Sequence, residues 1–371
     1  MYAQHDASMR WHEILARIEG LEDIPFDLDV VNILQTQARA THSNRPIQFH
    51  TPTFKHFHTA EIAACNKHAW PAISITGGRC KLQCDHCKAK ILEPMHAAPT
   101  PADLWRVVNE QIAHGAQGML LTGGSNHRNE VEYAPFYHTV RRIKDAFPMF
   151  RIAAHTALMD ADSARAMQDA GVDVAMLDVI GAQQTITQVY HLRRGVEDFE
   201  RTLENLLMTR MRVVPHIVLG LHYGEFLGEP EALEIVRRHL PSALVLVVAM
   251  PYYANPKRPY RIPNITEIAA FFRLARMRLP QIPLLLGCAR PAGIVKAQID
   301  AYAVMAGLDG VAHPSEGVVE LAMRLGRHVR VTPTCCSIVD GAEVGLQLEV
   351  DALLSTQGRL GRLKEIKIVM E

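Results

Sequence analysis

Three cysteines within eight residues constrain this chain more than any other feature of its sequence. Cys80, Cys84 and Cys87 stand in the run Gly-Gly-Arg-Cys-Lys-Leu-Gln-Cys-Asp-His-Cys, with the spacing C-x3-C-x2-C. No fourth cysteine lies nearby, so a [4Fe–4S] cluster held by these thiolates keeps one iron without a protein ligand. A cluster that only transfers electrons normally has a cysteine on every iron. The open iron therefore indicates a cluster that binds a further molecule and takes part in chemistry.

Zinc is the alternative occupant of such thiolates. A structural zinc site requires four closed ligands, usually from two paired motifs such as C-x2-C. His86 is the available fourth ligand, but it stands between Cys84 and Cys87, where its side chain is poorly placed to join them. The spacing favours the cluster.

The three-cysteine spacing resembles the defining signature of the radical S-adenosylmethionine (SAM) superfamily. The resemblance implies that the open iron binds the amino and carboxylate groups of SAM. It also implies that one electron from the cluster cleaves SAM to methionine and a 5′-deoxyadenosyl radical, which removes a hydrogen atom from an unactivated carbon. The cofactors carry this chemistry, while the protein orients them and excludes water.

Composition excludes several other classes of protein. The chain has 371 residues, 48% hydrophobic and 21% charged, which fits one large soluble domain or a domain with appendages. Its net charge of zero lacks the excess of basic residues that is typical of nucleic-acid-binding proteins. No apolar run reaches about 18 residues, and the N-terminus lacks the layout of a signal peptide, so no membrane association is expected. Seven cysteines, odd in number and unevenly spread, do not suggest a disulfide framework, and we expect a cytoplasmic protein.

Short β-branched apolar runs alternate with amphipathic helical stretches from about residue 72 onward, which is typical of βα units around a parallel sheet. The predicted strands are 72–75, 119–122, 150–155, 172–178, 213–219, 243–249, 283–287 and 310–313. The helical patterns between them include 103–114, 162–170, 197–208 and 265–279. Eight strands over roughly 240 residues match a complete (β/α)8 barrel.

We therefore predict an α/β fold, a (β/α)8 TIM-type barrel of the radical SAM superfamily, over residues 72–325. Residues 1–71 form an N-terminal appendage with a helix near 11–18 and an irregular stretch over 46–58. Residues 326–371 form a C-terminal extension whose final apolar run over 365–370 could be a strand.

The site of such a barrel lies at the C-terminal ends of its strands. The cysteine loop follows the first predicted strand, and Gly123, Gly124 and Ser125 follow the second. These three resemble the Gly-Gly-Glu motif that contacts the SAM amino group, although serine occupies the last position. Glycines allow close backbone approach to a ligand. A plain glycine-rich turn is the alternative.

Asp178 follows the fourth predicted strand, and Tyr190-His-Leu-Arg193-Arg194 comes soon after. This segment resembles the one in lipoyl and biotin synthases where a carboxylate binds the SAM ribose and an arginine binds the SAM carboxylate. The offset from Tyr190 favours Arg194 over Arg193, and a guanidinium binds a carboxylate bidentately. A solvated charge at a helix start is the alternative for either arginine.

Four more residues stand at predicted strand ends. Gly220 ends the fifth strand, like the glycine-containing edge that packs on adenine elsewhere in the superfamily. The other three are His155, His222 and His313. Each of these histidines either donates a hydrogen bond in the site or has a structural role.

The remaining cysteines suggest a second cluster. Cys288 ends the seventh predicted strand, Cys335 and Cys336 lie beyond the eighth, and Cys65 precedes the barrel. Enzymes that insert sulfur often carry an auxiliary iron–sulfur cluster whose sulfide is consumed. Cys288, Cys335 and Cys336 could hold one, completed by Cys65 or Ser337. Alternatively, only one of the adjacent cysteines is a ligand, or the two form a redox pair.

Most of the chain resembles the two-component, biotin-synthase-like lipoyl synthases. The resembling segments are 70–78, 86–95, 213–224 and 286–291. The resemblance implies addition of sulfur to an octanoyl chain on a lipoyl-bearing protein, a sister radical SAM subunit, and a reducing electron donor such as a ferredoxin or flavodoxin.

The chain also departs from better-known relatives. Single-chain lipoyl synthases have a three-cysteine motif before the barrel, where this chain has Cys65 alone, and biotin synthases have cluster cysteines on middle strands, where it has none. Two rival functions stay open: a radical SAM enzyme that makes a different bond by cyclisation, methylation or rearrangement, and a non-enzymatic iron–sulfur scaffold.

Overall fold

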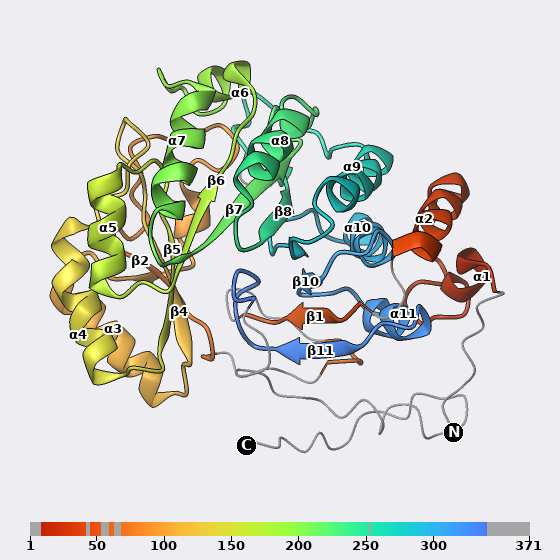
Figure 1. The fold of residues 1–371 in the computed structure, drawn as a ribbon, viewed down its shortest axis with the longest axis horizontal. Coiled ribbons are helices and arrows are strands. Elements are labelled where there is room, and N and C mark those ends of the chain that lie inside the picture. The colour runs from red at the N-terminus through yellow and green to blue at the C-terminus, as the bar shows by residue number, and fades with distance from the viewer. Residues whose placement is uncertain (1–8, 42–44, 53–58, 63–67, 252–253, 340–371) are drawn as a thin grey trace.

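The protein is a parallel α/β structure built on one sheet. The computed structural model describes residues 9–41, 45–52, 59–62, 68–251 and 254–339. Their strands form an 11-stranded sheet with the order β11-β1-β10-β9-β8-β7-β6-β5-β4-β2-β3, and every pairing is parallel. The sheet curves around a central space, with helices on its outer side (Figure 1). The TIM-type α/β prediction is confirmed, in a half-barrel whose edge strands are β3 and β11.

The strands are short and follow the chain in regular alternation with helices. They are β1 (Ile47–His50), β2 (Ala72–Ser74), β3 (His96–Ala97), β4 (Gly118–Thr122), β5 (Arg151–His155), β6 (Val174–Asp178), β7 (Arg212–Leu219), β8 (Leu244–Val248), β9 (Leu284–Leu286), β10 (Gly310–Ala312) and β11 (Val329–Thr332). All eight strands predicted from the sequence are present, as β2 and β4 to β10.

The helices include the four that the sequence predicts, here α3, α5, α7 and α9. The full set is α1 (Trp11–Leu15), α2 (Leu28–Thr41), α3 (Pro101–Ala113), α4 (Tyr137–Ala146), α5 (Ala161–Ala170), α6 (Gln183–Gln188), α7 (Val196–Leu207), α8 (Glu229–His239), α9 (Ile265–Arg278), α10 (Ile294–Met305) and α11 (Val318–Arg324), with 3-10 turns η1 (Lys90–Leu92) and η2 (Ala134–Phe136).

Local sequence explains where several helices begin and end. The Thr100 hydroxyl accepts a hydrogen bond from the Asp103 N–H and caps α3, and the Asp160 carboxylate caps α5 in the same way. Gly171 ends α5 at a φ of 99°, a left-handed conformation that favours glycine. These capping residues define the start of α3 and both ends of α5.

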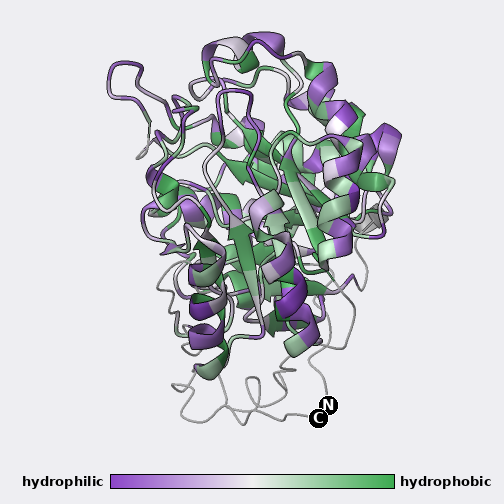
Figure 2. Ribbon diagram, turned by 90° about the vertical axis from the view of Figure 1, so that its left-hand side faces the viewer, coloured by the Kyte–Doolittle hydropathy of each residue, from purple (hydrophilic) through white to green (hydrophobic). Residues whose placement is uncertain are grey.

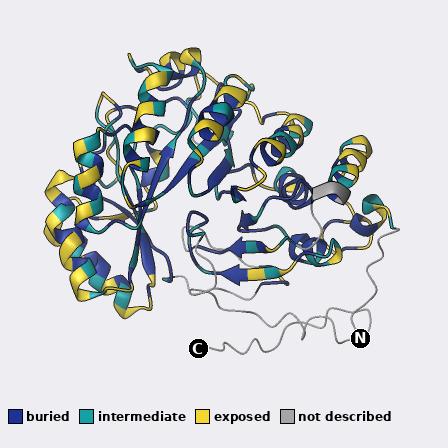
Figure 3. Ribbon diagram, viewed as in Figure 1, coloured by how far each residue is buried: buried dark blue, intermediate teal, exposed yellow. Residues whose placement is uncertain are grey.

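Apolar side chains fill both sides of the sheet. The strands are buried and apolar, while the outer helices present hydrophilic, exposed faces to solvent (Figures 2 and 3). A second apolar cluster fills the central space, and it includes Trp70, Met176, Val245, Leu285 and Cys336. The segment after β11 therefore enters the space that the strands enclose.

Two strands come from outside the predicted barrel boundaries. Ile47–His50, within the predicted appendage, forms β1 between β10 and β11, and β11 belongs to the predicted C-terminal extension. Burial of Ile47 and Phe49 stabilises β1 in the sheet, in contrast to the irregular structure expected over 46–58. The predicted helix near 11–18 is present as α1, while the possible strand over 365–370 lies outside the described residues.

Within the described residues, no helix has the length and apolar character needed to cross a membrane.

Candidate active site

A cavity of about 350 Å³ lies at the C-terminal ends of the strands. Both cysteine sets contribute to its wall, the first through Cys80, Cys84 and Cys87, and the second through the three cysteines that follow β9 and β11. Much of the remaining wall is apolar, including Trp70, Leu82, Leu92, Met95, Leu120, Val131, Met176, Phe199, Val218 and Val247. The cavity combines sulfur ligands with an apolar wall.

The cysteine loop follows β2 and is fixed against the glycine-rich turn after β4. The Cys80 thiol donates to the Ser125 carbonyl at 3.7 Å, and the Lys81 N–H donates to the same carbonyl at 2.9 Å. A Cβ on Gly124 would lie 2.0 Å from the Arg79 carbonyl oxygen and 2.6 Å from the Cys80 Cα. Glycine at position 124 is therefore required for this close approach.

The neighbours of one thiol of the first set favour its ionisation. The Cys84 thiol donates a hydrogen bond to Cys87 and lowers the pKa of Cys87 well below its ordinary value, and His86 adds to this effect. Because a thiolate is the form that binds metal, Cys87 is prepared for ligation. The His86 ring also contacts the Tyr190 ring in a tilted arrangement, with ring centroids 5.1 Å apart.

The placement of the thiols does not fit a single zinc ion. Zinc bonds of about 2.3 Å bring tetrahedral ligand atoms within roughly 4 Å of one another. In the described part of the chain, neither cysteine set brings three ligand atoms within 4.8 Å of one another. A [4Fe–4S] cluster places its thiolates on different irons and needs wider spacing. The sulfur donors suit an iron–sulfur cluster, and their placement does not suit a single tetrahedral ion.

A carboxylate and two histidines form one polar part of the wall. Burial opposes ionisation of Asp178, but the His155 Nε2 lies 3.6 Å from its carboxylate and lowers the pKa of Asp178 to about 2. The Tyr190 hydroxyl donates to the same carboxylate at 3.3 Å. Burial lowers the pKa of His216 to about 4, and its Nδ1 lies 3.2 Å from the Val214 carbonyl. Asp178 is thus an anionic acceptor within the cavity.

The second cysteine set converges on the same cavity. Hydrogen bonds with Cys288 and Cys335 raise the pKa of Cys336 well above its ordinary value. The same contact with Cys336 lowers the pKa of Cys335, and the Ser337 hydroxyl donates to the Cys335 sulfur at 3.1 Å. Cys336 therefore contacts both Cys335, its neighbour after β11, and Cys288 at the end of β9.

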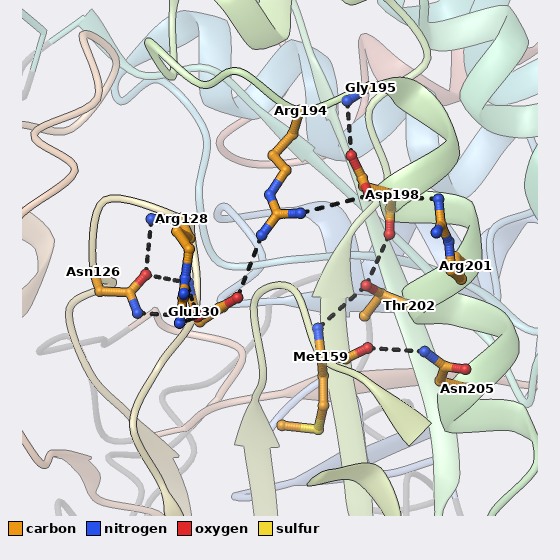
Figure 4. Close-up of polar contacts among 10 residues, drawn as sticks. All are labelled: Asn126, Arg128, Glu130, Met159, Arg194, Gly195, Asp198, Arg201, Thr202 and Asn205. Carbon is orange, nitrogen blue, oxygen red and sulfur yellow. Dashed lines mark hydrogen bonds and ion pairs between the residues drawn. The ribbon is translucent and has the colours of Figure 1, made fainter. Parts of the chain in front are cut away.

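Some predicted site residues lie elsewhere. Arg194 is absent from the cavity wall, and its guanidinium faces Glu130 at 3.4 Å and Asp198 at 3.8 Å (Figure 4). Gly220 also lies outside the wall, at a φ of 71° with its N–H donating to the Glu229 carboxylate. Cys65 lies outside the described residues. By contrast, Gly123, Gly124, Ser125, His155 and Asp178 all line the cavity.

Asp85, which sequence reasoning did not single out, organises the cysteine loop. Its side chain is 2% exposed. The carboxylate accepts hydrogen bonds from the Tyr223 hydroxyl at 3.0 Å and from the Asn255 amide at 3.2 Å, and it forms an ion pair with the Lys88 ammonium at 2.8 Å. Burial opposes its ionisation, but hydrogen bonds from Lys88, Asn255, His191 and Tyr223 lower its pKa. The partners come from distant segments, so the only sequence signal was the position of Asp85 between two cysteines.

Arg290 fixes the end of β9, next to Cys288. It is buried, pairs with Asp300 at 2.5 Å, and donates to the carbonyls of Gly287, Ala312 and His313 at 2.6, 2.5 and 2.9 Å. These contacts tie the end of β9, where Cys288 stands, to the end of β10.

Comparisons with known proteins agree with this geometry. The model of the Radical SAM superfamily matches residues 74–237. The [FeFe]-hydrogenase maturase HydG from Carboxydothermus hydrogenoformans is 12% identical, with a TM-score of 0.51 over 85% of this chain and 75% of its own. Another HydG structure is 14% identical, with a TM-score of 0.52 over 87% of this chain and 74% of its own.

Methylornithine synthase (PylB) is similar to the same extent, at 12% identity and a TM-score of 0.51 over 85% of this chain and 90% of its own. At these identities the likeness shows the fold alone. No curated protein matches the chain.

Proposed function

We propose, from the match of the Radical SAM superfamily model to residues 74–237, that this chain is a sulfur-inserting radical SAM enzyme of the lipoyl synthase type. Its substrate in this proposal is an octanoyl chain carried on a lipoyl-bearing protein. A sister radical SAM subunit shares the reaction, as in the two-component synthases that the sequence resembles.

The observation that carries the proposal is the presence of two cysteine sets on one cavity wall. Cys80, Cys84 and Cys87 would hold the SAM-binding cluster, and Cys288, Cys335 and Cys336 would hold an auxiliary cluster. When bound, the first cluster with SAM supplies the radical that removes hydrogen, and the second supplies sulfide. A short-lived carbon radical cannot await a diffusing donor, so both groups must face the same space.

The residues of the wall support this division of roles. The Gly124 backbone lies against the Cys80 loop, where Gly123 and Ser125 continue the turn that we assign to the SAM amino group. The Asp178 carboxylate, ionised and facing the cavity, is suited to accept hydrogen bonds from ribose hydroxyls. Arg194 stays our proposed partner of the SAM carboxylate, an assignment that requires it to leave Glu130 and Asp198.

The apolar wall supports an aliphatic substrate. Side chains such as Leu120, Met176, Val218 and Val247 offer no hydrogen bonds and favour a hydrocarbon chain over a polar one. They also offer water little to bind, which protects a reactive intermediate. A methylation or a rearrangement adds no sulfur and would need no sulfide-donating cluster on this wall.

The test is an anaerobic assay of the reconstituted protein with an octanoylated peptide, with and without the sister subunit, read by mass. We expect 5′-deoxyadenosine and a peptide that has gained sulfur. Deoxyadenosine without sulfur gain, at full iron content, would reject sulfur insertion in favour of another radical SAM reaction. No deoxyadenosine from protein that binds iron would instead indicate a scaffold.

A further inference from the structure

The second cysteine set offers three thiolates, whereas a [4Fe–4S] cluster with a protein ligand on every iron needs four ligands. The three cysteines of this set, Cys288, Cys335 and Cys336, all line the cavity. Ser337 does not line it, and its hydroxyl instead donates to the Cys335 sulfur at 3.1 Å. Among the described residues, a fourth ligand must therefore come from another side chain of the cavity wall.

Three histidines of the described chain line this cavity, and their contacts distinguish them. His86 stands inside the first cysteine motif. The His155 Nε2 lies 3.6 Å from the Asp178 carboxylate, which occupies that nitrogen. His216, on β7, contacts the Val214 carbonyl through its Nδ1 at 3.2 Å. His216 is thus the histidine whose Nε2 is available to a ligand in the cavity.

The contact with Val214 fixes the tautomer of the His216 ring. A carbonyl oxygen only accepts hydrogen bonds, so the Nδ1 of His216 carries the proton. Burial lowers the pKa of His216 to about 4, so the ring is neutral at pH 7 and its Nε2 keeps a lone pair. Within the described residues, no hydrogen bond uses this Nε2. Metal-binding histidines have this arrangement, in which the other ring nitrogen donates to a carbonyl.

His216 and the second cysteine set share one region of the cavity. Burial lowers the pKa of His216, and the nearby charge of Cys288 opposes that shift. The His155 ring lies beside His216, with centroids 5.6 Å apart. Burial also lowers the pKa of His155, but Asp178 and the charge of Cys335 together raise it. Both ends of the cysteine set therefore act on this pair of rings.

We propose that the His216 Nε2 is the fourth ligand of the auxiliary cluster, beside the three thiolates of the second cysteine set, which rests on the auxiliary cluster of the proposed function. Imidazole nitrogens replace thiolates on one iron of Rieske centres, and there they raise the reduction potential. A neutral imidazole leaves the cluster one charge less negative than a fourth thiolate would. His216 therefore both binds the cluster and raises its potential.

His50, at the end of β1, is the rival ligand and the matched control. It is fully buried and does not line the cavity. Burial lowers the pKa of His50 to about 4, and the charge of Cys288 opposes that shift, as it does at His216. Its Nδ1 lies 3.5 Å from the Thr334 hydroxyl, which can donate or accept, so its tautomer is not fixed. Its Nε2 has no hydrogen-bond partner among the described residues.

The test isolates the second cysteine set in the full-length chain. Alanine at Cys80, Cys84 and Cys87 removes the ligands of the first cluster, so the iron bound after anaerobic reconstitution belongs to the second. The protein is prepared with and without 15N-labelled histidine. Pulsed electron paramagnetic resonance of the reduced cluster then detects histidine nitrogen bound to iron. His216→Cys, which offers a fourth thiolate, is compared with His50→Gln in the same background.

We expect the parent protein to bind about four irons per chain and to show a histidine nitrogen on iron. His216→Cys should keep the iron, lose the nitrogen signal and lower the midpoint potential, because a thiolate adds negative charge. His50→Gln should match the parent in all three measurements. The labelled parent carries no substitution at either histidine, so it tests for a histidine ligand even where a variant fails to fold.

Three results would overturn the proposal. About four irons without a histidine nitrogen would assign the fourth position to another ligand, such as Cys65. A nitrogen signal that survives His216→Cys, or that disappears in His50→Gln, would reject His216 as the ligand. Absence of iron from the second set would reject the auxiliary cluster of the proposed function as well. A histidine-bound cluster in a protein that transfers no sulfur rejects the function alone, so the two failures are distinguishable.

Discussion

A single methyl group at position 124 should displace the first cluster. In Gly124→Ala the new Cβ would lie 2.0 Å from the Arg79 carbonyl oxygen and 2.7 Å from the Cys80 Cβ, where heavy atoms normally approach no closer than about 3.5 Å. The loop must therefore move by more than roughly 1 Å. Overpacking of this kind lowers the free energy of unfolding by about 1–3 kcal/mol. Here the residue that must move is Cys80, a proposed cluster ligand.

The assay is iron and sulfide content after anaerobic reconstitution, with electron paramagnetic resonance of the reduced protein. We expect Gly124→Ala to lose about four irons per chain, the content of one [4Fe–4S] cluster. Thermal unfolding should show that the barrel persists, because the clash is confined to loops.

Gly78→Ala is the matched control. It lies two residues before Cys80, and its new Cβ would meet only the Glu93 Cγ, at an ordinary 3.8 Å. Its iron content should equal that of the wild type. Full iron content and an unchanged spectrum in Gly124→Ala would refute the argument that this glycine holds the Cys80 loop in place.

Three further predictions test other parts of the molecule. A triple alanine variant of Cys288, Cys335 and Cys336 should still cleave SAM but bind about four fewer irons and form no thiolated product; unchanged iron would make these cysteines structural. Arg194→Ala should weaken SAM binding about ten- to a hundredfold, the loss of a charge-assisted contact of about 1.5–3 kcal/mol; an unchanged Kd would limit Arg194 to its ion pairs. Burial raises the pKa of Glu61 from 4.5 to about 7, so the free energy of unfolding should fall by about 3 kcal/mol as pH rises between these values. Glu61→Gln should flatten that slope in urea unfolding, and a retained slope would assign it to another group.

The sequence predicted the features that depend on neighbours along the chain. Eight strands could be located because each is a short apolar run between helical patterns, and parallel strands buried on both faces show this composition. The cysteine loop could be recognised in the same way, because its three cysteines stand within eight residues of one another. Gly123, Gly124, His155 and Asp178 line the cavity because residues that end parallel strands meet at one edge of a sheet.

Features that depend on distant partners were not predictable in this way. β1 is four residues long, and its sheet partners lie about 260 and 280 residues further along the chain. Asp85 is notable only because Val189, Tyr223 and Asn255 reach it from other loops. The role of Arg194 was assigned from its distance along the chain from Tyr190. That distance does not fix where a long side chain points, because its direction also depends on nearby charges such as Glu130.

The most direct test of the account is SAM cleavage by the whole reconstituted protein under anaerobic, reducing conditions. The account predicts that the wild type forms 5′-deoxyadenosine, whereas alanine at Cys80, Cys84 or Cys87 abolishes it and leaves the barrel folded. Undiminished 5′-deoxyadenosine from any of these three variants would contradict it.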